Sequence, residues 1–240
     1  MSILLEVCVD SSEGLAAAIA GGADRIELCS ALELGGLTPT PGLIGQAAVS
    51  PIPIYAMIRP RPGNFRFVEA DIDAMLREID AVRSSGLAGV VFGANLVNGQ
   101  LDHTTLERLI RQCGDLGVTL HRAFDLVPDL AEAVTMAIEL GFERILTSGR
   151  SLTALEGIED LEKTFELAVD RIKIMPGSGI NISNVSLLLD RIAFEEIHSS
   201  CAVAAPVVSK AATRLGFETA SQKQTSLELV RALKNYCLSN

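Results

Sequence analysis

The sequence predicts a single α/β domain over residues 1–240, folded as a (β/α)8 or TIM barrel. Eight short strand-like stretches alternate with amphipathic helix-like segments along the whole chain, each strand about one βα unit from the next. Nearly every strand has one apolar and one polar face, which suits the wall of a barrel. An open doubly wound sheet, the main competing fold, usually has strands that are apolar on both faces. No linker-like stretch rich in Pro, Ser or Gly divides the chain, so we expect one domain.

The expected strands are rich in aliphatic residues and lie at 4–10, 25–30, 54–58, 89–92, 118–121, 144–147, 171–175 and 196–199. The expected helices place aliphatic residues at three- and four-residue spacing, as Ile72, Met75 and Ile79 do. They lie at 12–20, 68–84, 104–116, 130–140, 155–168, 185–189 and 226–237. Glycines such as Gly141 end several helices just before the next strand. The segment after residue 200, from Cys201 to Thr225, is the least periodic and predicts a long loop before the closing helix.

The composition argues against several classes of partner. The chain has 20 basic and 30 acidic residues, a formal net charge of −10, so we expect no nucleic-acid partner and no binding to anionic membranes. No apolar run reaches the ~18–20 residues of a membrane span. The N-terminus lacks a basic region followed by an apolar one, so it does not predict a secretory signal. The five cysteines include no CxxC pair, which predicts free thiols in a reducing cytoplasm.

Period-two alternation places Glu6 with Cys8, and Glu27 with Cys29, on one face of the first two strands. In a barrel this face points inward, and the carboxyl ends of the strands form the active face. The residues expected to face inward are Glu6, Cys8, Glu27, Cys29, Met57, Arg59, His121, Thr147, Lys173, Met175 and His198.

Three of these residues, Glu27, His121 and Lys173, are candidate catalytic groups. Glu27 and His121 have side chains suited to proton transfer, and Lys173 can hold an anion. The alternative is structural: buried charges are costly unless paired, so the acids and bases of the interior can simply neutralise one another.

Two loops have the features of anion-binding sites. Gly177, Ser178 and Gly179 follow the seventh strand, where barrels often hold phosphate. Arg59 and Arg61 stand in a proline-stiffened loop and can clamp a carboxylate or phosphate. A rigid rim loop whose arginines offset the acidic surface is the competing interpretation.

The inward thiols suggest a metal site. Cys8 and Cys29 lie on neighbouring strands, and thiolates, together with nearby thioethers and imidazoles, favour copper(I) or zinc. The alternative is that both cysteines are small apolar fillers, since the close ligand spacing of structural zinc sites is missing.

Several longer segments together resemble the CutC copper homeostasis family. They are LEVCVDS, GGADRIELCS, GGLTPTPG, MIRPRPGNF, GVVFG, HRAFD, GFERILTSG, MPGSGI and EIHSS, in this order from Leu5 to about Ser200. The resemblance implies a cytoplasmic, often homo-oligomeric TIM barrel linked to copper tolerance, in which copper binding has been proposed for cysteines that match Cys8 and Cys29. It implies no assigned enzymatic reaction.

The chain departs from this pattern at three places. Ser178 replaces a usual glycine, and Asn64 stands where relatives often have aspartate. The segment from Cys201 to Gly216 is more apolar than in relatives, which suggests a subunit interface.

Three functions therefore remain open at this point. The first is a copper-handling protein that binds Cu(I) through Cys8 and Cys29. The second is an enzyme that acts on a small phosphorylated or carboxylated metabolite by acid–base chemistry. The third is a non-catalytic scaffold.

Overall fold

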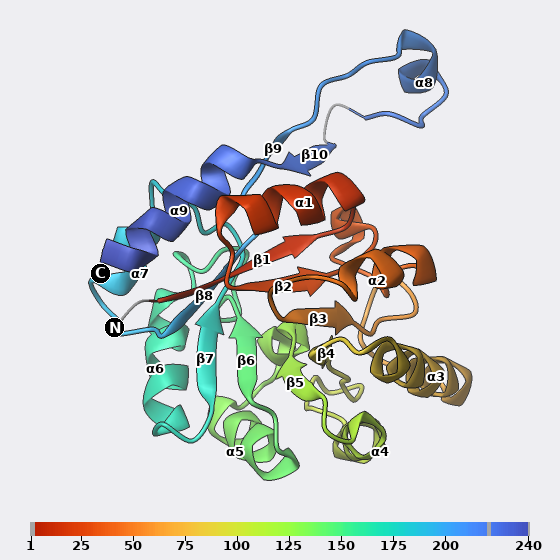
Figure 1. Ribbon diagram of the computed structural model, residues 1–240. Helices are drawn as coiled ribbons and strands as arrows, with labels where there is room; N and C mark the ends of the chain where they lie inside the picture. The colour runs from red at the N-terminus through yellow and green to blue at the C-terminus, as the bar shows by residue number, and fades with distance from the viewer. Residues whose placement is uncertain (1–2, 220–221, 240) are drawn as a thin grey trace.

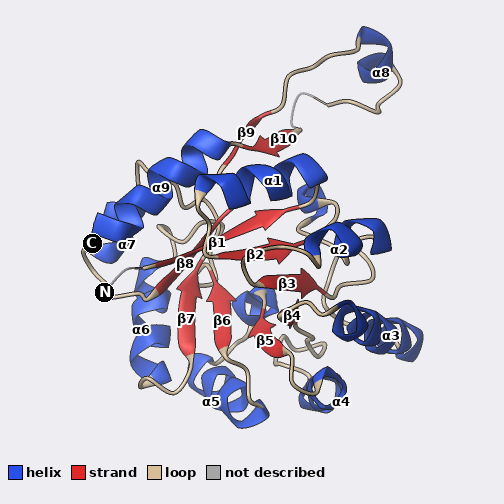
Figure 2. Ribbon diagram, viewed as in Figure 1, coloured by secondary structure: helices blue, strands red, loops and turns tan. Residues whose placement is uncertain are grey.

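Eight parallel strands surround a central axis in the computed structural model, which describes residues 3–219 and 222–239 (Figures 1 and 2). The strands are β1 (Leu4–Val9), β2 (Arg25–Leu28), β3 (Ile54–Met57), β4 (Gly89–Phe92), β5 (Gly117–Leu120), β6 (Arg144–Thr147), β7 (Lys173–Pro176) and β8 (Glu196–Ser199). They are hydrogen-bonded in the order β7-β6-β5-β4-β3-β2-β1-β8, and β7 lies beside β8, which nearly closes the ring. The predicted (β/α)8 fold is confirmed.

Helices cover the outside of the ring (Figure 2). They are α1 (Ser12–Gly21), α2 (Pro41–Ala47), α3 (Glu69–Ser85), α4 (His103–Cys113), α5 (Leu130–Leu140), α6 (Ile158–Ala168), α7 (Val185–Leu189) and α9 (Leu227–Ser239). Helix α2 was not predicted; it is a short helix that begins at Pro41 and is capped by the Thr40 hydroxyl, which accepts a hydrogen bond from the Leu43 N–H. Within the described residues, no helix is long and apolar enough to cross a membrane.

The segment after β8 contains more structure than the expected loop. It forms an antiparallel pair, β9 (Ala202–Ala204) with β10 (Lys223–Thr225), and a short helix, α8 (Lys210–Arg214). Figure 1 shows α8 at the tip of an arm that extends away from the barrel. Val208 and Phe217 on this arm are strongly exposed. The predicted subunit interface at this segment stays a prediction.

Alternate residues of each strand pack against the helices and make the main core. Leu5, Val7, Ile26, Leu28 and Ile145 are fully buried on that outer side. The other residues of each strand face the barrel axis, so the strands read apolar on one side and polar on the other.

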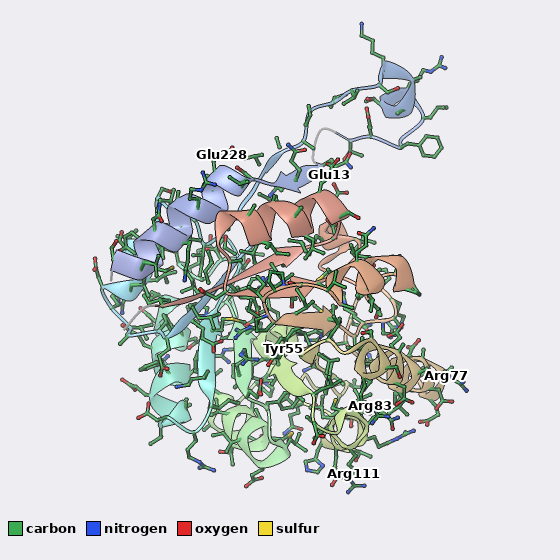
Figure 3. All side chains as sticks on the ribbon, viewed as in Figure 1. Glu13, Tyr55, Arg77, Arg83, Arg111 and Glu228 are labelled. Atoms are coloured by element: carbon green, nitrogen blue, oxygen red, sulfur yellow. The ribbon has the colours of Figure 1, made fainter. Side chains whose placement is uncertain are left out.

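A layer of paired charges fills the amino-terminal part of the barrel interior. Arg25 donates to Glu6 through Nε and to Glu196 Oε2 through Nη2 at 2.5 Å. Arg144 Nε lies 3.0 Å from the same Glu196 oxygen. The ring of Tyr55, which Figure 3 labels, lies against both guanidinium groups. The interior therefore does contain mutually neutralising charges. Glu6 is one of the residues expected there, whereas its partners Arg25, Arg144 and Glu196 were not among the residues expected to face inward.

Candidate functional site

A cavity of about 460 Å³ opens at the carboxyl ends of the strands. Its lining includes Cys8 from β1, Glu27 from β2, His198 from β8 and His121 just after β5, together with residues of the loop after β7. This is the end at which (β/α)8 barrels place their active sites.

The register of the parallel strands brings three chemically reactive side chains together. Cys8 on β1 pairs with Glu27 on β2, and Glu6, two residues before Cys8, pairs with His198 on β8. As a result, one ligand atom each from Cys8, Glu27 and His198 lie within 4.8 Å of one another. All three residues are buried, and such a group can hold a metal ion.

The imidazole of His198 is held by the Glu6 carboxylate, which lies deeper in the barrel. Its Nδ1 lies 2.8 Å from Glu6 Oε1, and its Nε2 lies 3.8 Å from Glu27 Oε2. Burial alone would raise the pKa of Glu6, but the Arg25 guanidinium and the His198 hydrogen bond hold that pKa at about 2. Burial also works against protonation of His198, yet Cys8 and Glu6 raise the imidazole pKa well above its usual value. Without a metal, His198 is therefore an imidazolium among acidic groups.

Glu27 has a buried carboxyl group that can accept a further hydrogen bond or bind a ligand. Its Oε1 has no hydrogen-bond partner among the described residues. Burial raises the pKa of Glu27 to about 7, although the His198 charge opposes that rise. Glu27 therefore changes its charge near neutral pH.

His121 presents a second unpartnered atom to the cavity. Its Nδ1 accepts a hydrogen bond from the Ala123 N–H at 3.2 Å, and its Nε2 is buried without a partner among the described residues. Burial, followed by the positive charge of Arg59, lowers the pKa of His121 to about 3. The ring is therefore neutral at neutral pH and carries its proton on Nε2.

The structure separates Cys29 from the open part of the cavity. Cys29 is fully buried and packs with Tyr55, Met57 and Val91, and its Sγ lies 3.7 Å from Glu27 Oε2. Burial, and then the charge of Glu27, raises the pKa of the Cys29 thiol well above its usual value. Cys29 is thus next to the cluster, whereas Cys8 is part of it.

Lys173 lies on the expected face of β7 but at the wrong end of the strand. Its Nζ pairs with Glu195 Oε1 at 2.6 Å, and 44% of its side chain is exposed. It does not reach the cavity that Glu27 and His121 line. Thr147 also differs from the expectation, because Leu146 lines the cavity and the Thr147 hydroxyl donates to Asp125.

The two predicted arginines brace a loop at the rim. Arg59 Nη1 donates to the Leu34 and Gly36 carbonyls at 2.9 and 3.0 Å. Arg61 Nε donates to Asp71 Oδ2 at 2.9 Å. Neither side chain is part of the cavity lining.

The glycine-containing loop after β7 contributes in part to the cavity. The Gly177 N–H donates to the Thr147 carbonyl at 2.9 Å, whereas Ser178 and Gly179 line the cavity. Both of these residues have a positive φ, +74° for Ser178 and +79° for Gly179. The Ser178 hydroxyl donates to the Leu152 carbonyl, which helps to hold this conformation.

The sequence placed His198 on the inward face and made its imidazole one of several possible soft ligands, but the predicted ligand pair was Cys8 and Cys29. The signal was available, because Glu196 and His198 alternate as Glu6 and Cys8 do, and closure of a barrel sets the last strand beside the first. Phe65 and Lys223 also line the cavity and were not selected. Both come from loops and edges, where no periodicity indicates which way a side chain points.

Fold and site together define a TIM-barrel protein with a buried thiol, imidazole and carboxyl cluster at the carboxyl end of its strands. The CutC family model matches residues 3–203. The family protein CutC of Rhizobium meliloti (strain 1021) is 53% identical over 232 residues, which cover 97% of this chain and 95% of that relative. A family protein CutC of Caulobacter vibrioides (strain NA1000 / CB15N) is 57% identical over 198 residues, 82% of this chain and 81% of the relative. The chain belongs to the CutC family.

The solved structure of a family member agrees with this assignment. The crystal structure of a CutC protein from Streptococcus agalactiae is similar with a TM-score of 0.79 and 30% identity, covering 82% of this chain and 98% of that one. A phosphoribosylanthranilate isomerase from Thermotoga maritima has a TM-score of 0.56 at 15% identity, and this likeness concerns the fold alone. The resemblance seen in the sequence is thus confirmed at the level of family and fold.

Proposed function

We propose that the protein binds Cu(I) in the cavity at the carboxyl end of the barrel, with Cys8 Sγ and His198 Nε2 as the primary ligands. The observation that carries this proposal is the grouping of Cys8, Glu27 and His198, whose ligand atoms lie within 4.8 Å of one another. The family name supports copper as the cargo, since the Streptococcus relative is named for copper homeostasis.

The chemistry of the donor atoms fits this metal. Thiolate is a soft ligand that selects Cu(I), and imidazole binds copper as well as zinc. A Cys8 thiolate and one Cu(I) ion have opposite charges, so binding adds no net charge to a buried site. Glu27 stands beside both ligands and can supply a further oxygen.

The carboxylate that orients the His198 ring is already in place. Metal-bound histidines usually donate their other ring N–H to a carboxylate, which fixes the orientation of the ring. Glu6 is that carboxylate for His198, and Arg25 in turn holds Glu6. Because Nδ1 is committed to Glu6, His198 would hold a copper ion through Nε2.

Cys29 has a secondary place in this proposal. The strand register sets Glu27, and not Cys29, opposite Cys8, and the Cys29 thiol packs with Tyr55, Met57 and Val91 and donates to Glu27. We therefore expect Cys8 and His198 to bind the copper ion directly, and Cys29 to affect its affinity only through its contact with Glu27.

Titration of the reduced protein with Cu(I) against a competing chelator, without oxygen, tests the proposal. We expect Cys8→Ser and His198→Asn to weaken Cu(I) binding by more than the roughly 10- to 100-fold typical of losing a residue that only hydrogen-bonds a metal ligand. Cys29→Ser should have a smaller effect. Cys201→Ser is the matched control, because Cys201 also lines the cavity but stands outside the cluster. Parental affinity in both Cys8→Ser and His198→Asn would refute the proposal.

A further inference from the structure

The cavity is much larger than a single metal ion requires. Its volume of about 460 Å³ lies in the usual range for small-molecule sites, roughly 300–1,000 Å³. The cluster of Cys8, Glu27 and His198 occupies only the side formed by β8, β1 and β2. In a ring of eight strands β5 stands opposite β1, so His121 faces the cluster from across the cavity.

The Nε2–H of His121 is the strongest sign that this second side binds something. The residue is 3% exposed, its Nδ1 is occupied by the Ala123 N–H, and its Nε2 has no partner among the described residues. A buried donor without an acceptor is unfavourable, so a ligand oxygen placed there gains a hydrogen bond that the protein alone does not make.

The surroundings of His121 hold this donor in a fixed position. The Phe65 ring lies against the imidazole with centroids 4.6 Å apart. A Cβ added at Gly93 would lie 2.7 Å from His121 Nδ1, so only glycine leaves room for the ring. Asn95 donates to the Ala123 carbonyl at 3.1 Å and steadies the short helix Arg122–Leu126 that follows His121. A donor held in this way is ready for binding before the ligand arrives.

The charges at the cavity favour an anionic ligand. Arg122 lines the cavity but is paired with Asp125 at 2.7 Å. Lys223 on β10 also lines it, and within residues 3–219 and 222–239 no carboxylate pairs with its ammonium group. The free positive charge is therefore at the rim, on the arm side of the cavity.

The rest of the lining favours an organic body over a bare inorganic ion. Met57, Phe65 and Leu146 offer apolar surface beside the polar groups. A small-molecule site typically combines such surface with a few fixed polar contacts.

We infer that this cavity binds a small organic acid, a carboxylate or a phosphate ester, with one ligand oxygen accepting the hydrogen bond of His121 Nε2–H and the anionic group near Lys223. This site goes beyond copper binding and does not depend on it, because His121 and Lys223 are separate from the cluster of Cys8, Glu27 and His198.

Nuclear magnetic resonance of protein labelled with 15N in its histidines tests the inference directly. The metal-free, chelator-treated protein is titrated with pyruvate, glycerol 3-phosphate and inorganic phosphate, and glycerol serves as the uncharged control. We expect a saturable shift of the His121 Nε2 signal with at least one of the two organic anions, at lower concentration than with phosphate, and none with glycerol. No shift with either organic anion, or a shift with phosphate alone, would overturn the inference.

Variants provide a second, independent readout. His121→Leu and Lys223→Ala should each weaken binding of the organic anion at least tenfold, and His103→Gln, at an exposed histidine, should leave it unchanged. The titration of the parent protein decides the matter if His121→Leu does not fold. The anion titration uses metal-free protein and the copper titration uses no organic anion, so failure of the copper proposal and failure of this one can be told apart.

Discussion

The Nδ1 of His198 lies 2.8 Å from Oε1 of Glu6, and the two residues are separated by 192 positions in the chain. This contact joins the charged layer of the barrel to the candidate metal cluster, because Glu6 also binds Arg25. The inner charges thus determine which nitrogen of His198 faces Cys8.

Replacement of Glu6 by glutamine should affect both metal binding and folding. The amide cannot supply the negative charge that Arg25 and His198 share, so we expect Cu(I) affinity to fall about 10- to 100-fold. The free energy of unfolding should fall by roughly 3–5 kcal/mol, as for the loss of one partner of a buried ion pair. Chelator competition and urea unfolding measure the two effects. Glu195→Gln is the control, because its pair with Lys173 is largely exposed and should contribute less than about 1 kcal/mol.

Acidification should destabilise the protein through His121. Its pKa is about 3 in the fold and near the usual 6.5 in the unfolded chain, so the unfolded chain binds an extra proton between these values. Stability should therefore decrease as the pH falls below about 6.5, and at pH 5 the expected loss from this residue is about 2 kcal/mol. In His121→Gln this contribution should be missing. Urea unfolding at pH 7 and pH 5 measures it, and an equal loss of stability in parent and variant would contradict the assignment.

Gly93→Ala tests how closely the imidazole of His121 is packed. The new methyl group would lie 2.7 Å from His121 Nδ1 and 2.8 Å from the Ala123 Cβ. We expect a loss of about 1–3 kcal/mol from overpacking, together with a changed chemical shift of the His121 Nε2. Gly45→Ala is the matched control, since its added Cβ meets nothing within 4 Å, and alanine in a helix should stabilise by about 0.5–1 kcal/mol. Unchanged stability and an unchanged His121 signal in Gly93→Ala would show that the ring has room to move.

Lys173→Met should leave both proposed sites intact. The lysine pairs with Glu195 at the amino-terminal rim and does not line the cavity. We expect unchanged Cu(I) affinity and a change in the free energy of unfolding below about 1 kcal/mol. A large loss of binding in this variant would mean that Lys173 acts at the cavity after all, as the sequence suggested.

The inward face of most strands was predictable, because side chains alternate along a strand whatever surrounds it. Glu6, Cys8, Glu27 and His198 were all placed on the correct side for this reason. The register between strands and the depth of a residue along the barrel axis cannot be predicted from one strand alone. The register decides that Glu27 rather than Cys29 stands opposite Cys8, and depth along the axis decides that a residue such as Lys173 ends at the rim.

The partners of the interior arginines were harder to predict still. Arg25 and Arg144 stand at the beginning of their strands, where a sequence pattern does not distinguish an interior residue from a solvent-facing one. Their burial follows from Glu196, which reaches both of them from β8. Such contacts depend on closure of the whole ring, and no local feature of the sequence reports them.

The charged layer formed by Arg25, Glu6, Glu196 and Arg144 closes the barrel interior on the amino-terminal side of the cavity. Its side chains are nearly inaccessible to solvent, so a copper ion reaches Cys8 from the carboxyl end of the strands, where two neighbouring cavities include Cys8 in their lining. A molecule held by His121 would cover the approach through the cavity that His121 lines, and the second approach beside Asp10 and Glu33 would stay open to the ion. The residence time of copper would then depend on how far the organic acid narrows its way out.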